Sequence, residues 1–192
     1  MNLCDQYKLM HEQGAFKGYS LLPHVEDIAK LVKQYDAKTL LDYGCGKGLQ
    51  YTEKKAHEAW GGIMPTLYDP HVRGFDSYLH ERDPQILMFD GVICTDVLEH
   101  IDDSSECDVY MVLKTLFNHA EKFIFLTICT RPAKKNLPDG RNCHLTVQSK
   151  EWWLQKMKQM VTSMQQNISW VDDNGVLSPI IDKPKLYVKF VE

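Results

Sequence analysis

Apolar residues follow two alternating spacings along the chain, one typical of helices and one typical of strands. Over residues 21–35 they recur at helical intervals, which predicts an amphipathic helix that starts near Ser20 and Pro23. Residues 39–43 form a short apolar strand that leads into a glycine-rich turn. The same criteria predict strands over residues 65–68, 89–95 and 123–129, and helices over residues 49–59, 73–82, 104–120 and 149–164, the last with Ser149 as its cap.

This order of elements predicts an α/β fold. The inner strands are apolar on both faces, which is typical of a parallel sheet covered by helices on either side, so we expect a doubly wound, mostly parallel sheet. After a long loop over residues 130–142, residues 168–171 and 186–191 predict a C-terminal antiparallel strand pair around an Asn174-Gly175 turn. We find no linker or repeat, and therefore expect a single domain over residues 1–192.

The composition is that of an ordinary globular protein. The chain has 192 residues, of which 44% are hydrophobic and 25% are charged. Its formal net charge of -4 gives no general attraction to a nucleic-acid backbone, although one segment carries a basic cluster, Arg131, Lys134, Lys135 and Arg141.

Cys94 and Cys129 lie in apolar runs, where we expect them to pack as small hydrophobic residues. Since no signal pattern, C-x-x-C pair or membrane-spanning stretch is present, we expect a cytoplasmic protein without a membrane partner.

A glycine-rich turn over residues 42–48, Asp-Tyr-Gly-Cys-Gly-Lys-Gly, follows the first predicted strand. Ligands of doubly wound folds bind at the carboxyl ends of the strands, so this turn is a candidate nucleotide site. A phosphate-binding P-loop is excluded, because Lys47 is followed by glycine and not by Ser or Thr. A dinucleotide fingerprint is disfavoured, because Leu49 takes the place of its third glycine. The spacing is instead acidic-x-G-x-G-x-G.

With this spacing the chain resembles the class I S-adenosylmethionine-dependent methyltransferases, whose first motif has the same form. The resemblance implies a Rossmann-like fold, S-adenosyl-L-methionine as the cofactor, and cofactor contacts by four residues of the turn, Asp42, Gly44, Cys45 and Gly46. It further implies that Asp69, at the end of the second predicted strand, binds the ribose hydroxyls, with Pro70 beside it. The alternative for this pair is a turn-forming Asp-Pro.

A second specific motif follows the predicted strand over residues 89–95. The run Asp96-Val97-Leu98-Glu99-His100 matches the family's fourth motif and resembles small-molecule methyltransferases, which implies that Asp96 is a further cofactor contact. Between Val72 and Leu87 we predict no strand, so the residues that contact the adenine are left open.

Two histidines are candidates for the methyl-acceptor side of the site. His100 follows the central strand and His144 follows the long loop, and either imidazole can act as a general base or orient the acceptor. The alternative is that His100 caps a helix and that His144 packs structurally. Together with Asp96 and Glu99, these histidines resemble the set that holds a divalent ion in small-RNA 2′-O-methyltransferases. Because the same run is frequent without an ion, we assign no metal from the sequence.

The activity we expect is methyl transfer to a small-molecule hydroxyl, because the chain is acidic and has no separate recognition domain. Three alternatives stay open: an RNA or protein methyltransferase, with or without a metal; a dinucleotide-dependent oxidoreductase; and a cofactor-binding module without catalysis. Residues 1–20, with Tyr7, His11, Phe16 and Tyr19, are expected to form either a lid over the cofactor or a poorly ordered terminus with a few docking aromatic residues.

Overall fold

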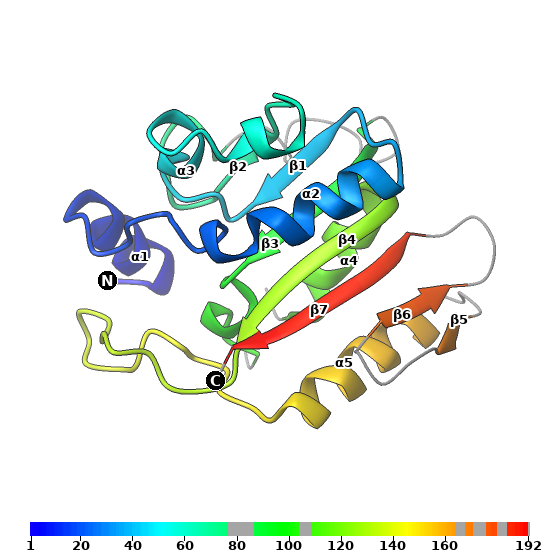
Figure 1. The fold of residues 1–192 in the computed structure, drawn as a ribbon. Coiled ribbons are helices and arrows are strands. Elements are labelled where there is room, and N and C mark those ends of the chain that lie inside the picture. The colour runs from blue at the N-terminus through cyan, green and yellow to red at the C-terminus, as the bar shows by residue number, and fades with distance from the viewer. Residues whose placement is uncertain (77–86, 104–108, 164–167, 171–175, 180–183, 192) are drawn as a thin grey trace.

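A seven-stranded sheet forms the centre of the protein (Figure 1), in a computed structural model that describes residues 1–76, 87–103, 109–163, 168–170, 176–179 and 184–191. The strand order is β2-β1-β3-β4-β7-β6-β5. The strands are β1 (Leu40–Tyr43), β2 (Thr66–Tyr68), β3 (Phe89–Thr95), β4 (Ala120–Cys129), β5 (Ile168–Trp170), β6 (Val176–Pro179) and β7 (Lys185–Val191). The first five strands in this order are parallel, which confirms the predicted mostly parallel sheet.

Helices cover both faces of the sheet (Figure 1). They are α1 (Leu3–Glu12), α2 (Val25–Gln34), α3 (Leu49–Thr52), α4 (Val109–His119) and α5 (Lys150–Ser163), with the 3-10 helices η1 (Leu22–His24), η2 (Ala56–Trp60) and η4 (Leu98–His100). On one face α2 and η2 pack on the side chains of Leu40 and Ile93, and on the other α4 and α5 pack on Leu41 and Val92. All four strand residues are buried, which explains why the inner strands are apolar throughout.

Most differences between the predicted and the observed elements lie in the segments that connect the strands. The strand over residues 89–95 has the predicted bounds. The continuous helix predicted over residues 49–59 is wrong, because Lys55, with a left-handed φ of 52°, separates α3 from η2. Residues 73–76 form turns and not the start of the helix predicted over residues 73–82, whose other residues lie outside the described part of the chain.

The C-terminal strands also pair differently from the prediction. β7 lies parallel to β4, β6 is antiparallel to β7, and β5 is antiparallel to β6. The direct pairing predicted between residues 168–171 and 186–191 is therefore wrong, because β6 lies between the two strands. The predicted Asn174-Gly175 turn falls outside the described residues.

Two segments outside the sheet lie together at one of its ends. α1 and the long segment of residues 130–149 lie beyond the carboxyl ends of the central strands (Figure 1). This segment ends at Ser149, whose hydroxyl accepts a hydrogen bond from the N–H of Trp152 at 3.3 Å, as expected of the cap of α5. In the part of the chain that the structure describes, no helix is long and apolar enough to cross a membrane.

Candidate functional site

A cavity of about 570 Å³ lies at the carboxyl ends of the parallel strands. Its wall is formed by the turn after β1, the residues after β2, the end of β3, the segment after β4, and α1 with the residues that follow it. Most of the site residues predicted from the sequence line this cavity: Gly44, Gly46, Asp69, Pro70, Asp96, His100 and His144.

Gly44 and Gly46 place the turn after β1 between the residues that follow β3 and β2. Gly44 has a φ of 81°, and a Cβ atom at this position would lie 2.2 Å from Cγ2 of Val97, which follows β3. Gly46 has a φ of 57°, and its N–H donates a hydrogen bond at 2.9 Å to Oδ2 of Asp69, which follows β2. The glycine turn is therefore shaped by its packing against protein on both sides, in addition to any approach to a ligand.

Asp42 and Cys45 are buried and are not among the residues that line the cavity. Asp42 is fully buried, and its Oδ2 accepts hydrogen bonds at 2.8 Å from Nε2 of Gln50 and from the hydroxyl of Tyr51, both on α3. Burial raises the pKa of Asp42 to about 7, against the opposing effect of these two hydrogen bonds. Asp42 thus ties β1 to α3, and a cofactor contact by Asp42 or Cys45 stays a prediction.

Asp69 uses both of its carboxylate oxygens within the protein. Its Oδ2 accepts the N–H of Gly46, and its Oδ1 accepts the N–H of His71 at 2.9 Å. The second bond forms the Asp-Pro turn that the sequence left open as an alternative. Each carboxylate oxygen keeps a further lone pair, so Asp69 can still accept hydrogen bonds from ligand hydroxyls in the cavity.

Asp96 has a left-handed backbone, with a φ of 54°, at the end of β3. Thr127 on β4 holds it in this conformation. The N–H of Asp96 donates to Oγ1 of Thr127 at 3.0 Å, and the Thr127 hydroxyl donates to Oδ1 of Asp96 at 2.7 Å. A strained residue with a side chain that a neighbouring strand holds in place is common at functional sites.

Glu99, in η4, is a fully buried acid that also lines the cavity. Its Oε1 accepts the N–H of Cys129 at 2.9 Å, whereas Oε2 has no hydrogen-bond partner among the described residues. Burial, with Asp96 nearby, raises the pKa of Glu99 to about 8. Glu99, Cys129 and His144 each offer a metal-ligating atom within 4.8 Å of the other two. Asp96, which the sequence placed in such a set, is bonded to Thr127 and is not in this group.

The two predicted histidines lie side by side, with ring centroids 4.7 Å apart and planes at 85°. Nδ1 of His144 lies 2.7 Å from the carbonyl oxygen of Arg131. Because a carbonyl oxygen only accepts hydrogen bonds, Nδ1 carries the proton and Nε2 keeps its lone pair. Burial, together with the nearby His144, lowers the pKa of His100 to about 3, so its ring is neutral at neutral pH.

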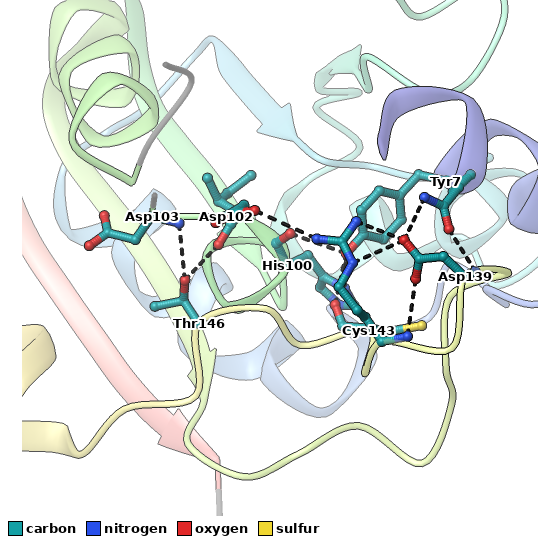
Figure 2. Close-up of polar contacts among 10 residues, drawn as sticks. Tyr7, His100, Asp102, Asp103, Asp139, Cys143 and Thr146 are labelled. Carbon is teal, nitrogen blue, oxygen red and sulfur yellow. Dashed lines mark hydrogen bonds and ion pairs between the residues drawn. The ribbon is translucent and has the colours of Figure 1, made fainter. Parts of the chain in front are cut away.

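The N-terminal segment covers one side of the cavity, where Tyr7, His11 and Phe16 form part of the wall. The hydroxyl of Tyr7 lies 2.7 Å from the carbonyl oxygen of Cys143 and 3.1 Å from that of His100 (Figure 2). The aromatic residues of the segment therefore dock on the protein, and residues 3–12 form the helix α1; a lid over the cofactor stays a prediction. Neither the backbone partners of Tyr7 nor the place of Cys129 beside Glu99 and His144 was predicted from the sequence, because neither residue belongs to a local motif.

The rim of the cavity is more basic than the net charge suggests. Four basic residues line the cavity although the formal charge of the chain is -4: Lys17, Arg131, Lys134 and Lys135. Three of them come from the segment after β4. This arrangement favours a ligand that carries negative charge near the rim.

Comparison with known proteins gave two findings. A family model described as a methyltransferase domain matches residues 19–177. A small RNA 2′-O-methyltransferase from Arabidopsis thaliana is 27% identical over an alignment of 137 residues that covers 56% of this chain. The chain spans only 14% of the length of that relative. No solved structure matches the chain.

Proposed function

Because the chain belongs to the methyltransferase-domain family, we propose that it transfers the methyl group of S-adenosylmethionine to a hydroxyl group held beside His100 and His144. The observation that carries this proposal is the composition of one cavity. Its wall holds the glycine turn and Asp69 together with a group of acidic and imidazole side chains. The glycine turn and Asp69 can bind a nucleoside cofactor, and the acidic and imidazole side chains can bind a hydroxyl group and take up its proton.

The cofactor side of the cavity fits S-adenosylmethionine. The turn brings Gly44 and Gly46 to the wall without side chains, and Asp69 keeps lone pairs for ribose hydroxyls. The buried Oδ1 of Asp42, which has no hydrogen-bond partner among the described residues, can accept from a water or an amine. When bound, the cofactor supplies a methyl group on a positively charged sulfur, so the protein needs to orient the acceptor and take up its proton.

The acceptor side offers a base with a defined tautomer. Arg131 holds the proton of His144 on Nδ1, so Nε2 presents a lone pair that can accept the hydroxyl proton. The neutral ring of His100 packs against it and adds no positive charge that would oppose this transfer. Tyr7 and Phe16 close the wall on this side and exclude water from the reacting groups.

A metal-assisted form of the reaction is a second candidate, favoured by the unpartnered, buried Oε2 of Glu99. Glu99 and His144 would hold a divalent cation, with the thiol of Cys129 as a third donor. A cation held there would lower the pKa of a hydroxyl bound to it.

The basic rim favours an acceptor whose hydroxyl lies close to a phosphate. The relative from Arabidopsis thaliana is, by its name, a methyltransferase of the 2′-oxygen of small RNA, and a ribose hydroxyl in RNA has that chemistry. We therefore place an RNA ribose ahead of the uncharged small molecule that the acidic composition favours. Arg131, Lys134 and Lys135 are the residues we expect to face the phosphate.

Titration calorimetry and methyl transfer test this proposal together. S-adenosylhomocysteine should bind and NAD should not, and Asp69→Asn should weaken the binding. Transfer of labelled methyl is then followed into short RNA and into a small-molecule extract, with and without a chelator. His144→Gln should abolish transfer, while His57→Gln, away from the cavity, should not. Absence of S-adenosylhomocysteine binding, or full turnover by His144→Gln, would contradict the proposal.

A further inference from the structure

Tyr7, on α1, contacts both of the segments that carry the acceptor-side histidines. We propose that Tyr7 is a positioning residue, whose hydroxyl holds the backbone at His100 and Cys143 together and thereby sets the distance between the imidazoles of His100 and His144. The inference rests on the proposed function, in which those imidazoles face the methyl acceptor. It gives the N-terminal helix a part in assembling the acceptor site, in addition to covering it.

The hydrogen bonds of Tyr7 carry the inference. The side chain is buried, and its hydroxyl donates toward two carbonyl oxygens, that of Cys143 at 2.7 Å and that of His100 at 3.1 Å. These residues are far apart in the chain, and Figure 2 shows Tyr7 reaching both from α1. Because His144 directly follows Cys143, any shift of the Cys143 carbonyl also moves the imidazole that serves as the base.

The ring of Tyr7 connects the acceptor side to the cofactor side. It lies edge-on to the ring of His100, with centroids 5.8 Å apart, and tilted against the ring of His71 at 5.2 Å. The N–H of His71 is bonded to Asp69, the acid that we expect to bind the ribose. A cofactor that orders Asp69 and His71 therefore also supports the place of Tyr7.

α1 is held in place by contacts other than the Tyr7 hydroxyl. Nε2 of Gln6 donates to Oδ2 of Asp139 at 2.9 Å, and the N–H of Asp139 donates to Oε1 of Gln6 at 3.0 Å. Arg141 pairs with both Asp139 and Asp102. Because these contacts keep α1 docked, Tyr7→Phe should remove the hydroxyl without detaching the helix, so the role in positioning can be separated from the role in packing.

Tyr35→Phe is the matched control for Tyr7→Phe. The hydroxyl of Tyr35 lies 2.6 Å from that of Tyr187, away from the cavity, so each variant loses one hydrogen-bonded phenol hydroxyl. With a short single-stranded RNA as acceptor, Tyr7→Phe should lower kcat about tenfold to a hundredfold, because the reacting groups are misplaced. KM for S-adenosylmethionine should stay unchanged, and Tyr35→Phe should leave both constants unchanged.

A spectroscopic measurement decides the question without turnover. The ring ¹⁵N resonances of His144, recorded with S-adenosylhomocysteine bound, should shift in Tyr7→Phe and stay in place in Tyr35→Phe; those of His100 are not used, because the Tyr7 hydroxyl lies 3.4 Å from its Nδ1. Unchanged ring resonances in Tyr7→Phe, or a wild-type kcat, would overturn the inference and leave Tyr7 a packing residue. If wild-type protein methylates no RNA, the proposed acceptor is wrong, and the ring resonances still show whether Tyr7 positions the imidazoles.

Discussion

Replacing Gly44 by alanine tests whether the glycine turn is fixed by its packing against the end of β3. A Cβ atom at this position would lie 2.2 Å from Cγ2 of Val97, and the φ of Gly44 is 81°. The left-handed conformation costs a residue with a side chain about 1–2 kcal/mol, and forcing a methyl group into a packed site costs about 1–3 kcal/mol. We therefore expect Gly44→Ala to lower the free energy of unfolding by about 2–5 kcal/mol.

Gly61→Ala is the control that separates these two costs. Gly61 has a φ of 82°, but no atom from elsewhere in the described chain lies within 4 Å of its Cβ position. Gly61→Ala should therefore lower the free energy of unfolding by only about 1–2 kcal/mol. Urea-induced unfolding of both variants measures the difference. Calorimetry with S-adenosylhomocysteine should show weaker binding for Gly44→Ala and wild-type binding for Gly61→Ala.

The contact with Val97 is tested directly by a double variant. Val97→Ala removes the atom that a Cβ at position 44 would meet, so it should restore part of the stability lost by Gly44→Ala. In the wild-type background the same change should only destabilise, and the two substitutions should therefore be non-additive. Equal losses in Gly44→Ala and Gly61→Ala would refute the packing argument, and so would additivity of the Gly44 and Val97 substitutions.

Three further predictions concern the contacts around the cavity. Because burial raises the pKa of Asp42 to about 7, the folded protein keeps a proton that the unfolded chain releases between about pH 4 and pH 7; the contribution of Asp42 to stability should fall as the pH rises through this window, so the difference in urea midpoint between wild type and Asp42→Asn should change with pH across it. Thr127→Val removes the hydroxyl that holds Asp96 and should weaken S-adenosylhomocysteine binding in calorimetry, while wild-type affinity would show that Asp96 needs no such support. In a double-mutant cycle, Gln6→Ala and Asp139→Ala should show a coupling energy of about 0.5–1.5 kcal/mol in chemical unfolding, and strict additivity would show that their hydrogen bonds do not stabilise α1.

The strands were predictable because burial on both faces leaves a pattern that is visible without knowing the neighbours. Val92 and Ile93 face opposite layers and are both fully buried, so β3 stands out as an apolar run. The backbone conformation of a single residue leaves no such pattern in the sequence. Nothing in the sequence indicates that Lys55 has a left-handed conformation, so the helix predicted over residues 49–59 included it. The place of β6 between β5 and β7 was equally hidden, since strand order depends on contacts between distant segments.

Most of the residues proposed to bind the cofactor could be placed on the cavity wall from the sequence, because they directly follow strands. The family expected from the glycine turn is confirmed by the match over residues 19–177. Within this motif, however, the sequence does not show which side chains face the ligand. Asp42 and Tyr43 alternate along β1, so Tyr43 lines the cavity while Asp42 turns toward α3.

The acceptor side could not be predicted in the same way, because it is assembled from separate segments. Tyr7 comes from α1, His100 from η4, and His144 from the segment after β4. Contacts join these segments: the Tyr7 hydroxyl donates to the carbonyl oxygen of Cys143, and Arg141 pairs with Asp102, which follows η4. A change in one segment therefore alters the wall that another presents. We therefore predict that acceptor specificity depends jointly on α1 and residues 130–149. Exchanging only one of them between related methyltransferases should impair transfer to the acceptor of either enzyme, whereas exchanging both should transfer the specificity.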